Sequence, residues 1–364
     1  MSESEIIPTK NGRSGFVAVV GRPNAGKSTL VNAIVGEKVA IVTPRPQTTR
    51  DRIRAIVSRD EGQLVLIDTP GIHKTKGFRE INRRMVQSAM ASFQEADCIV
   101  HMVDADKAVR HIGRIHPMDL EIRRGIKASN RRSILILNKV DQVRKPLLLP
   151  LIEQHMNPRE DEESCPYDEI LPTSAKAGTD VDTLVDLLFR MLPEGPMLYP
   201  EDQLTDRSTR FLVSEIIREK IFLNTRQELP YSTAVVVEVF EDKSKRIEIL
   251  AAIQVDRMSQ KGIVIGKGGS MLKTVGTAAR LELEKALGKK IFLKLHVRVE
   301  SEWSDRGRAL DELGYLVEID PRWASDPDSD EELDLEEQAL MAEEGLDSEA
   351  VAPEINEEPG SEDE

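Results

Sequence analysis

The sequence predicts an α/β first half with a doubly wound, mostly parallel sheet, followed by a smaller α+β domain and a disordered acidic tail. Three observations support this order. A glycine-rich loop at 21–28 stands between a strand-like run and a helical run, a proline-rich stretch at 193–200 interrupts the chain, and acidic residues dominate its end. The predicted boundaries are 1–13 for a flexible N-terminus, 14–192 for the first domain, 193–206 for a linker, 207–319 for the second domain and 320–364 for the tail.

The glycine-rich loop is a phosphate-binding loop in a strand–loop–helix setting. It follows the apolar run 16–20 and leads into the helix-compatible run 29–35. Glycines let backbone N–H groups turn around a phosphate without a Cβ in the way, and the positive end of the next helix faces the same anion. Lys27 is expected to reach the β- and γ-phosphates, and the Ser28 hydroxyl to hold magnesium.

The sequence Asn138-Lys139-Val140-Asp141, directly after the apolar run 133–137, predicts a guanine site. A carboxylate such as Asp141 accepts both the N1–H and the amine protons of guanine, which adenine cannot supply. Asn138 is expected at the other edge of the base, with the Lys139 stem along its face. Alone, the motif would indicate a polar loop. Its place more than a hundred residues after the phosphate loop favours the base site, because a doubly wound sheet gathers strand ends.

The sequence Ser174-Ala175-Lys176 follows a further strand-like run, 169–172. Its backbone N–H groups are expected to close the base pocket.

Asp68 ends the apolar run 64–67, so it should lie at the carboxyl end of a strand and hold magnesium through water. The N–H of Gly71 is expected to meet the γ-phosphate.

The loop 44–50 contains two threonines between the first helix and the strand-like run 52–57. We expect Thr49, rather than Thr48, to ligate magnesium only while the γ-phosphate is present, so that this loop and the one after Asp68 form a two-state switch. The alternative is an ordinary polar loop, since spacing alone supports the assignment.

Residues 21–176 resemble the GTP-binding domain of translation-factor-type GTPases. Two sequence motifs, Pro46-Gln47-Thr48-Thr49-Arg50 and Asp68-Thr69-Pro70-Gly71, resemble those of the Era group. The resemblance implies a P-loop GTPase domain that hydrolyses GTP. Ile72 stands where Ras-like enzymes carry the glutamine that orients water. Water must then be positioned by backbone, by a different side chain or by a cation, and the family comparison suggests a potassium ion held partly by Asn24. We interpret His73 as an exposed loop residue, since phosphoryl transfer depends mostly on positioning and charge.

These assignments give a complete set of site residues for GTP or GDP, Mg²⁺ and K⁺. The predicted nucleotide contacts are Gly21, Asn24, Ala25, Gly26, Lys27, Ser28, Thr29, Asp68, Gly71, Asn138, Lys139, Asp141, Ser174, Ala175 and Lys176. The predicted magnesium ligands are Ser28, Thr49 and Asp68, and the predicted catalytic residues are Lys27, Thr49, Gly71 and Asn24.

The second half predicts a helix at 208–222, strands at 233–240 and 246–255, a glycine loop, a helix at 270–287 and a strand at 290–300. This is the order of a type II KH domain. Its loop, Gly266-Lys267-Gly268-Gly269, is the expected G-x-x-G, where backbone can approach a sugar–phosphate chain and a neighbouring groove accepts about four bases. Lys261 and Lys273 flank it and complete the predicted RNA-binding residues. The alternative is a plain turn.

The resemblance to the Era group extends to residue 315 and includes Trp303. It implies binding near the 3′ end of small-subunit ribosomal RNA, a role in small-subunit assembly, a monomer in the cytoplasm, and peripheral association with the inner face of the cell membrane. Two other functions stay open: a GTPase acting on a protein or membrane partner, and an RNA chaperone with negligible turnover.

Charge divides the chain unevenly. The segment 320–364 contains nineteen Asp or Glu and one basic residue, a net charge of −18 within a chain total of −14, which leaves the rest at +4. The tail is therefore expected to be disordered and either solubilising or autoinhibitory. Two cysteines, Cys98 and Cys165, indicate neither a disulfide framework nor a zinc site. His101 is expected to be a core or strand-end residue, and we expect no signal peptide or membrane span.

Overall fold

The computed structural model describes residues 12–45, 48–71, 89, 91–157, 164–225, 229–301 and 303. The predicted acidic tail lies outside these residues, as do Ile72, His73 and most of the predicted N-terminal segment 1–13. Among the described residues, none of the helices has both the length and the apolar character that a membrane crossing needs.

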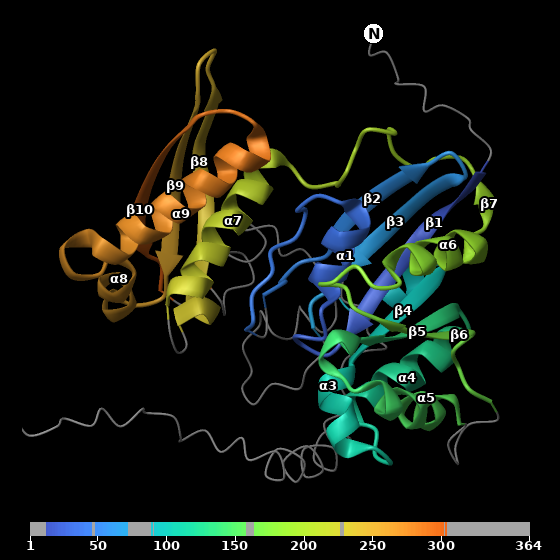
Figure 1. Cartoon of the computed structure of the whole chain (residues 1–364). Helices are drawn as coiled ribbons and strands as arrows, with labels where there is room; N and C mark the ends of the chain where they lie inside the picture. The colour runs from blue at the N-terminus through green and yellow to red at the C-terminus, as the bar shows by residue number, and fades with distance from the viewer. Residues whose placement is uncertain are drawn as a thin grey trace, which may run out of the picture. The chain divides into compact units, whose positions relative to one another are not determined.

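The first domain is built on one seven-stranded sheet with the order β2-β3-β1-β4-β5-β6, and β7 pairs with β1 (Figure 1). The β2–β3 and β1–β7 pairs are antiparallel and the other pairs are parallel, which confirms the mostly parallel sheet. The strands are β1 Gly12–Gly21, β2 Ile53–Arg59, β3 Gly62–Asp68, β4 Cys98–Asp104, β5 Arg132–Asn138, β6 Glu169–Thr173 and β7 Glu194–Gly195. Since β1 begins at Gly12, the sheet starts slightly before the predicted boundary at 14.

Helices cover both faces of this sheet. They include α1 Lys27–Val35, α3 Ala105–Ala108, α4 Pro117–Ser129, α5 Leu148–Met156 and α6 Val181–Met191, with the short 3-10 helices η1 Val109–His111, η2 Val140–Gln142 and η3 Lys145–Leu147. Alternate residues of β1 point to opposite sides. Val17 and Val19 pack with α1 and α6, whereas Ala18 and Val20 pack with α4 and α5. Because the strands are buried on both faces, their sequences are continuous apolar runs.

The predicted linker 193–206 is bound to the first domain. Its start forms β7, and farther along the N–H of Leu198 donates to the side-chain oxygen of Gln63 at 2.8 Å. The carbonyl of Leu204 accepts from the N–H of Ile56 at 2.9 Å. The connector therefore follows the sheet to the point where the second domain begins.

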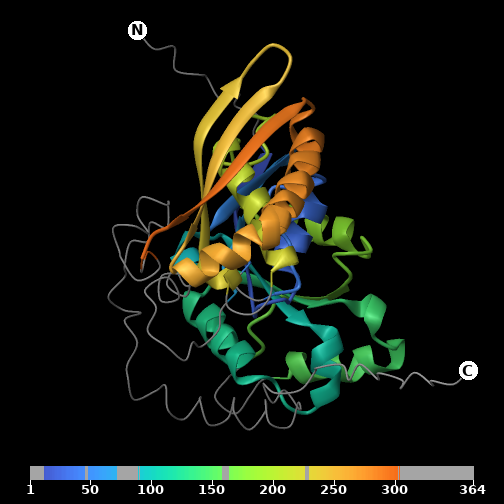
Figure 2. The same cartoon turned by 90° about the vertical axis from the view of Figure 1, so that its left-hand side faces the viewer.

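The second domain has a three-stranded sheet of order β10-β9-β8, with β8 and β9 antiparallel and β9 and β10 parallel. Its elements are α7 Thr209–Asn224, η4 Leu229–Ser232, β8 Thr233–Asp242, β9 Ile247–Val255, α8 Met258–Ile265, η5 Lys267–Gly269, α9 Ser270–Leu287 and β10 Ile291–Val299. Helices α7 and α9 lie on one face of the sheet (Figures 1 and 2). Ile216, Ile253, Val275 and Val297 belong to the core between them.

One element of this domain was absent from the predicted order. Helix α8 precedes the glycine loop, whereas the sequence predicts a loop that directly follows an apolar run. The helix has eight residues and only Val264 is buried, so it carries no apolar stripe of helical period that a sequence reading could detect. The G-x-x-G therefore joins two helices.

Candidate nucleotide site and RNA-binding loop

The phosphate loop leaves β1 at Gly21 and enters α1 after Gly26. Both glycines have positive φ, 152° and 103°. A Cβ on Gly26 would lie 2.2 Å from the side-chain nitrogen of Asn138, so this close approach requires glycine. Asn24, between them, also has positive φ, 63°, a conformation that Asn tolerates better than most residues.

Lys27 is the buried cation of this loop. Its side chain is 6% exposed and its ammonium donates to the carbonyls of Gly21 at 2.9 Å and Arg22 at 3.0 Å. Burial lowers the pKa of Lys27 to about 8, although the negative charges of Asp68 and Asp119 oppose the shift. An anion placed beside this ammonium would therefore gain a poorly solvated and strongly attracting partner.

The three predicted magnesium ligands meet next to Lys27. The Ser28 hydroxyl donates to Asp68 Oδ2 at 2.7 Å and lies 2.9 Å from the Thr49 hydroxyl, which is itself 3.4 Å from Asp68 Oδ2. Asp68 is fully buried, its Oδ1 has no hydrogen-bond partner in the described part of the chain, and burial raises its pKa to about 6. Two hydroxyls and a carboxylate are hard oxygen donors, so this cluster fits Mg²⁺.

The structure also distinguishes the two threonines of the loop 44–50. The Thr48 hydroxyl donates to the carbonyl of Arg45 at 2.8 Å and lies 2.6 Å from the Thr43 hydroxyl. Thr49 instead faces Ser28 and Asp68 and is 7% exposed. Thr49, and not Thr48, therefore lies in the oxygen cluster with Ser28 and Asp68, and its role as a magnesium ligand stays a prediction.

A cavity of about 520 Å³ opens at this cluster. Among the predicted site residues, its lining includes Asn24, Gly26, Lys27, Ser28, Thr29, Thr49, Gly71 and Lys139. Lys107, which is not among the predicted site residues, lines it as well. Lys107 follows the carboxyl end of β4, and the rule that parallel sheets bind ligands at their carboxyl edge was the signal available to find it.

The base end of the site contains contacts of Asn138 that the motif did not predict. The Asn138 amide donates to the carbonyl of Ala25 at 2.7 Å and its oxygen accepts from the N–H of Ala175 at 3.0 Å. Asn138 thus joins the phosphate loop to the loop 174–176, and the Ala175 N–H is used by Asn138 instead of facing a base. The bridge forms because the carboxyl ends of β1, β5 and β6 lie close together.

Asp141 lies at this end of the site beside Ser174, and its contact with guanine stays a prediction. It is exposed, and its Oδ1 accepts the Ser174 hydroxyl at 2.6 Å. Lys139 has a positive φ of 66° and its ammonium lies 2.5 Å from Asp104 Oδ2, which directs its stem along the pocket wall. Lys176 is exposed.

The predicted RNA-binding loop forms the turn between α8 and α9. Gly266, Gly268 and Gly269 have φ of 74°, 60° and 79°. A Cβ on Gly266 would lie 2.7 Å from the Met271 Cβ, whereas Cβ atoms on Gly268 and Gly269 would meet nothing within 4 Å. At the last two positions the left-handed backbone favours glycine, and the space over them is open.

Charged and apolar side chains flank this open turn. Lys267 and Lys273 are exposed and Lys261 is half-buried. Ile263 on α8 is 55% exposed. An open backbone with cations and an apolar side chain next to it matches what a nucleic-acid backbone and its unstacked bases need.

His101 is a core residue, as expected. It is 1% exposed, its Nδ1 lies 2.8 Å from the Tyr167 hydroxyl and its Nε2 lies 3.5 Å from Asp119. Cys98 is buried and Cys165 is partly buried, and both are free thiols.

Comparison with known proteins decides the family. Residues 16–139 match a family model described as a 50S ribosome-binding GTPase, and residues 228–304 match one described as a KH domain. The chain is 47% identical over 305 residues to the GTPase Era of Syntrophus aciditrophicus (strain SB), covering 83% of this chain and 95% of the relative. The chain belongs to the GTPase Era family.

Further Era proteins agree with this assignment. The Era family member of Geobacter sp. (strain M21) is 48% identical over 84% of this chain and 99% of its own length. A crystal structure of Era in complex with MgGDPNP and nucleotides 1506–1542 of 16S ribosomal RNA has a TM-score of 0.77 and 38% identity, covering 84% of this chain and all of the other. A variant of Aquifex aeolicus Era bound to GDP.AlF4⁻ has a TM-score of 0.78 at the same identity and coverage. This Era-family chain is therefore a GTPase with a KH domain.

Proposed function

We propose that this Era-family GTPase binds GTP and Mg²⁺ in the cavity beside the phosphate loop and binds small-subunit ribosomal RNA near its 3′ end through the KH domain. Its cycle of GTP binding and hydrolysis would then assist assembly of the small ribosomal subunit. The observation that carries the proposal is the oxygen cluster of Ser28, Thr49 and Asp68 beside the Lys27 ammonium. The related Era complex with MgGDPNP and 16S ribosomal RNA supports both halves of the proposal.

Each part of the cavity has a separate task in the proposed reaction. Lys27 and the N–H groups of the phosphate loop hold the β- and γ-phosphates and draw negative charge toward the protein. Ser28 and Thr49 would hold Mg²⁺ directly and Asp68 through water, and the ion would neutralise phosphate charge. Thr43, Arg45 and Thr48 line the same cavity, so the loop that carries Thr49 also limits the access of water.

Orientation of the attacking water needs a group other than the missing glutamine. We propose that a potassium ion, held partly by Asn24, orients this water. Asn24 lines the cavity and has a left-handed backbone conformation. Turnover should then be faster in potassium than in sodium at matched ionic strength, and Asn24→Ala should abolish the difference. Equal rates in the two salts would leave backbone groups as the positioning element.

The RNA half of the proposal depends on the turn between α8 and α9. Open space over Gly268 and Gly269 lets a sugar–phosphate backbone approach the protein main chain, and Lys267 adds a positive charge. We propose further that the protein acts as a monomer in the cytoplasm and that any contact with the cell membrane is peripheral.

Crosslinking in cells, with sequencing of the bound RNA, tests the proposed target. The expected result is enrichment of RNA from the 3′ end of the small-subunit ribosomal RNA. Crosslinks to proteins alone would favour a GTPase acting on a protein partner. GTP turnover measured with and without that RNA completes the test, because RNA binding without measurable turnover would indicate an RNA chaperone.

A further inference from the structure

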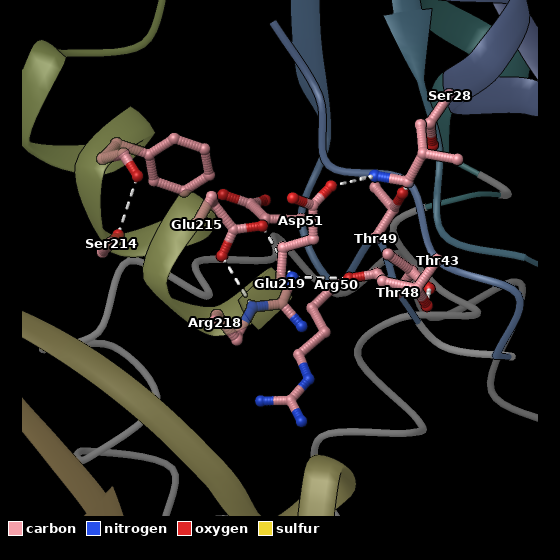
Figure 3. A network of polar contacts seen from close by, with 12 residues as sticks. Ser28, Thr43, Thr48, Thr49, Arg50, Asp51, Ser214, Glu215, Arg218 and Glu219 are labelled. Atoms are coloured by element: carbon pink, nitrogen blue, oxygen red, sulfur yellow. Dashed lines mark hydrogen bonds and ion pairs between the residues drawn. The ribbon is translucent and has the colours of Figure 1, made fainter. Parts of the chain in front are cut away.

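The second domain contacts the chain on both sides of Thr49, at the backbone carbonyl of Thr48 and at the side chain of Arg50. Arg218, on α7, donates through Nη2 to the carbonyl of Thr48 at 2.5 Å. Arg50 donates through Nη1 to the carbonyl of Thr233, at the start of β8, at 2.9 Å. Thr49 lies between these two contacts and sends its hydroxyl the opposite way, toward Ser28 (Figure 3).

Arg218 is itself held in a fixed orientation. It is 1% exposed and donates through Nε and Nη2 to the two carboxylate oxygens of Glu215, at 2.7 Å and 2.6 Å. Its guanidinium also lies over the Phe222 ring, 5.2 Å from the centroid. A bidentate Arg–Glu pair neutralises the buried charge and fixes the plane of the guanidinium, so the Nη2 contact to Thr48 has a defined direction.

Arg50 is enclosed by aromatic rings of the second domain. Its guanidinium lies 5.9 Å from the centroid of Phe222 and 5.8 Å from that of Trp303. Trp303 is fully buried and donates its indole N–H to the carbonyl of Ser232 at 3.2 Å. The groups around Arg50 thus come from α7, from the start of β8 and from Trp303, which lies four residues after the end of β10.

Two other contacts between the domains involve residues that precede Thr48 in the chain. Lys38 forms an ion pair with Glu219 at 2.7 Å, and the N–H of Val42 donates to the same carboxylate at 3.1 Å. These contacts join the domains at an earlier part of the loop. They provide a matched control, because losing them weakens docking and leaves the Arg218 contact in place.

We propose that Arg218 and Glu215 are positioning residues that fix the Thr49 hydroxyl for magnesium, so that the magnesium affinity of the GTP-bound state depends on the second domain. This inference rests on the proposed role of Thr49 as a magnesium ligand in that state. A loop residue that is already ordered loses less conformational entropy when it ligates an ion, so the contact of Arg218 with the Thr48 carbonyl favours ligation. GDP binding, in which Thr49 takes no part, does not depend on this contact.

The test measures dissociation of a fluorescent, non-hydrolysable GTP analogue and of fluorescent GDP from the full-length protein across a magnesium series. Arg218→Lys keeps a cation beside Glu215 but cannot hold both oxygens of Glu215 and the Thr48 carbonyl in one plane. The magnesium concentration for half-maximal retention of the GTP analogue should rise about tenfold, equivalent to about 1.4 kcal/mol, with GDP unchanged. The double variant Glu215→Gln with Arg218→Met, which leaves no unpaired buried charge, should show the same shift.

Two controls separate the possible outcomes. Lys38→Met should leave the magnesium dependence unchanged, and an equal shift in this variant would show that domain docking in general, and not Arg218, sets Thr49. If Thr49→Ala changes nothing, the proposed magnesium role of Thr49 fails. If Thr49→Ala shifts the curve and neither Arg218 variant does, the positioning role alone is wrong. An equal loss of GDP in both Arg218 variants would show a purely structural role.

Discussion

Lys27 and Asp68 have pKa values shifted toward one another by the same cause. Both are buried beside the phosphate loop, where loss of solvation disfavours the charged form of each side chain. Burial therefore lowers the pKa of Lys27 to about 8 and raises the pKa of Asp68 to about 6. A phosphate and a magnesium ion each favour the charged form of their partner. Binding of both ligands therefore reverses the shifts.

Magnesium-dependent GTP binding should consequently be tightest between about pH 6 and pH 8. Above pH 8 the free protein loses the Lys27 proton that the complex retains, so binding takes up a proton and affinity falls by at most about tenfold per pH unit. Below pH 6 protonated Asp68 no longer favours the ion. Titration of GTP affinity from pH 5 to pH 9.5 tests this, with Asp68→Asn as the control that should lack the acid limb. A flat alkaline limb would show that Lys27 does not meet the phosphates.

Asp141 should determine the choice of base. Asp141→Asn replaces the carboxylate by an amide that offers one donor to the base, so GTP binding should weaken and xanthosine triphosphate, with a 2-keto group, should bind better. Loss of one charge-assisted pair costs about 1.5–3 kcal/mol. Because Ser174 donates to Oδ1, the amide oxygen can keep that bond and hold the side chain in place. Competition between the two nucleotides measures the change, and an unaltered preference for GTP would remove Asp141 from the base pocket.

At the scale of elements, the strands were predictable because burial on both faces makes them continuous apolar runs, and β3 is buried at every residue. Sequence also located the phosphate loop and the threonine that faces Asp68. It did not give α8, whose single buried residue leaves no periodic signal. The Asn138 bridge could not be derived either, because its partners in the loops after β1 and β6 become neighbours only once the sheet has formed.

The contact between Arg218 and the Thr48 carbonyl likewise could not be predicted from the sequence. Arg218 and Thr48 are separated by 170 residues, and nothing in the local pattern of α7 marks a buried arginine that reaches a backbone carbonyl of another domain. Such a contact forms only when the two domains pack against each other, so a local sequence pattern does not predict it.

The α8–α9 turn supplies a prediction for RNA binding. Gly268→Asp places a negative side chain in the open space where a phosphate should approach, so affinity for single-stranded RNA should fall by more than tenfold. The positive φ of 60° adds strain, which Asp tolerates comparatively well. Gly268→Asn, with similar shape and no charge, is the matched control and should retain more binding. Filter binding measures both variants, and unchanged GTP affinity verifies the first domain. Equal RNA affinity in Gly268→Asp and the unaltered protein would mean that this loop is only a turn.

At the scale of the whole molecule, charge is divided between a mildly basic body and a strongly acidic end. Residues 1–319 carry a net charge of +4, and residues 320–364 carry −18. A polyanion tethered to a protein that binds RNA competes with RNA phosphates at a high effective concentration. The alternative is that the acidic residues only improve solubility.

Truncation after Asp320 should therefore tighten RNA binding and raise its on-rate at low salt. The gain should shrink as salt increases, because at about 0.15 M the screening length is about 8 Å and both competitors are weakened. A full-length variant in which the tail carboxylates are replaced by amides separates charge from length and should behave like the truncation. RNA affinities of the three proteins across a salt series decide the matter. If all three curves superimpose, the tail does not compete with RNA and its acidic residues serve solubility alone.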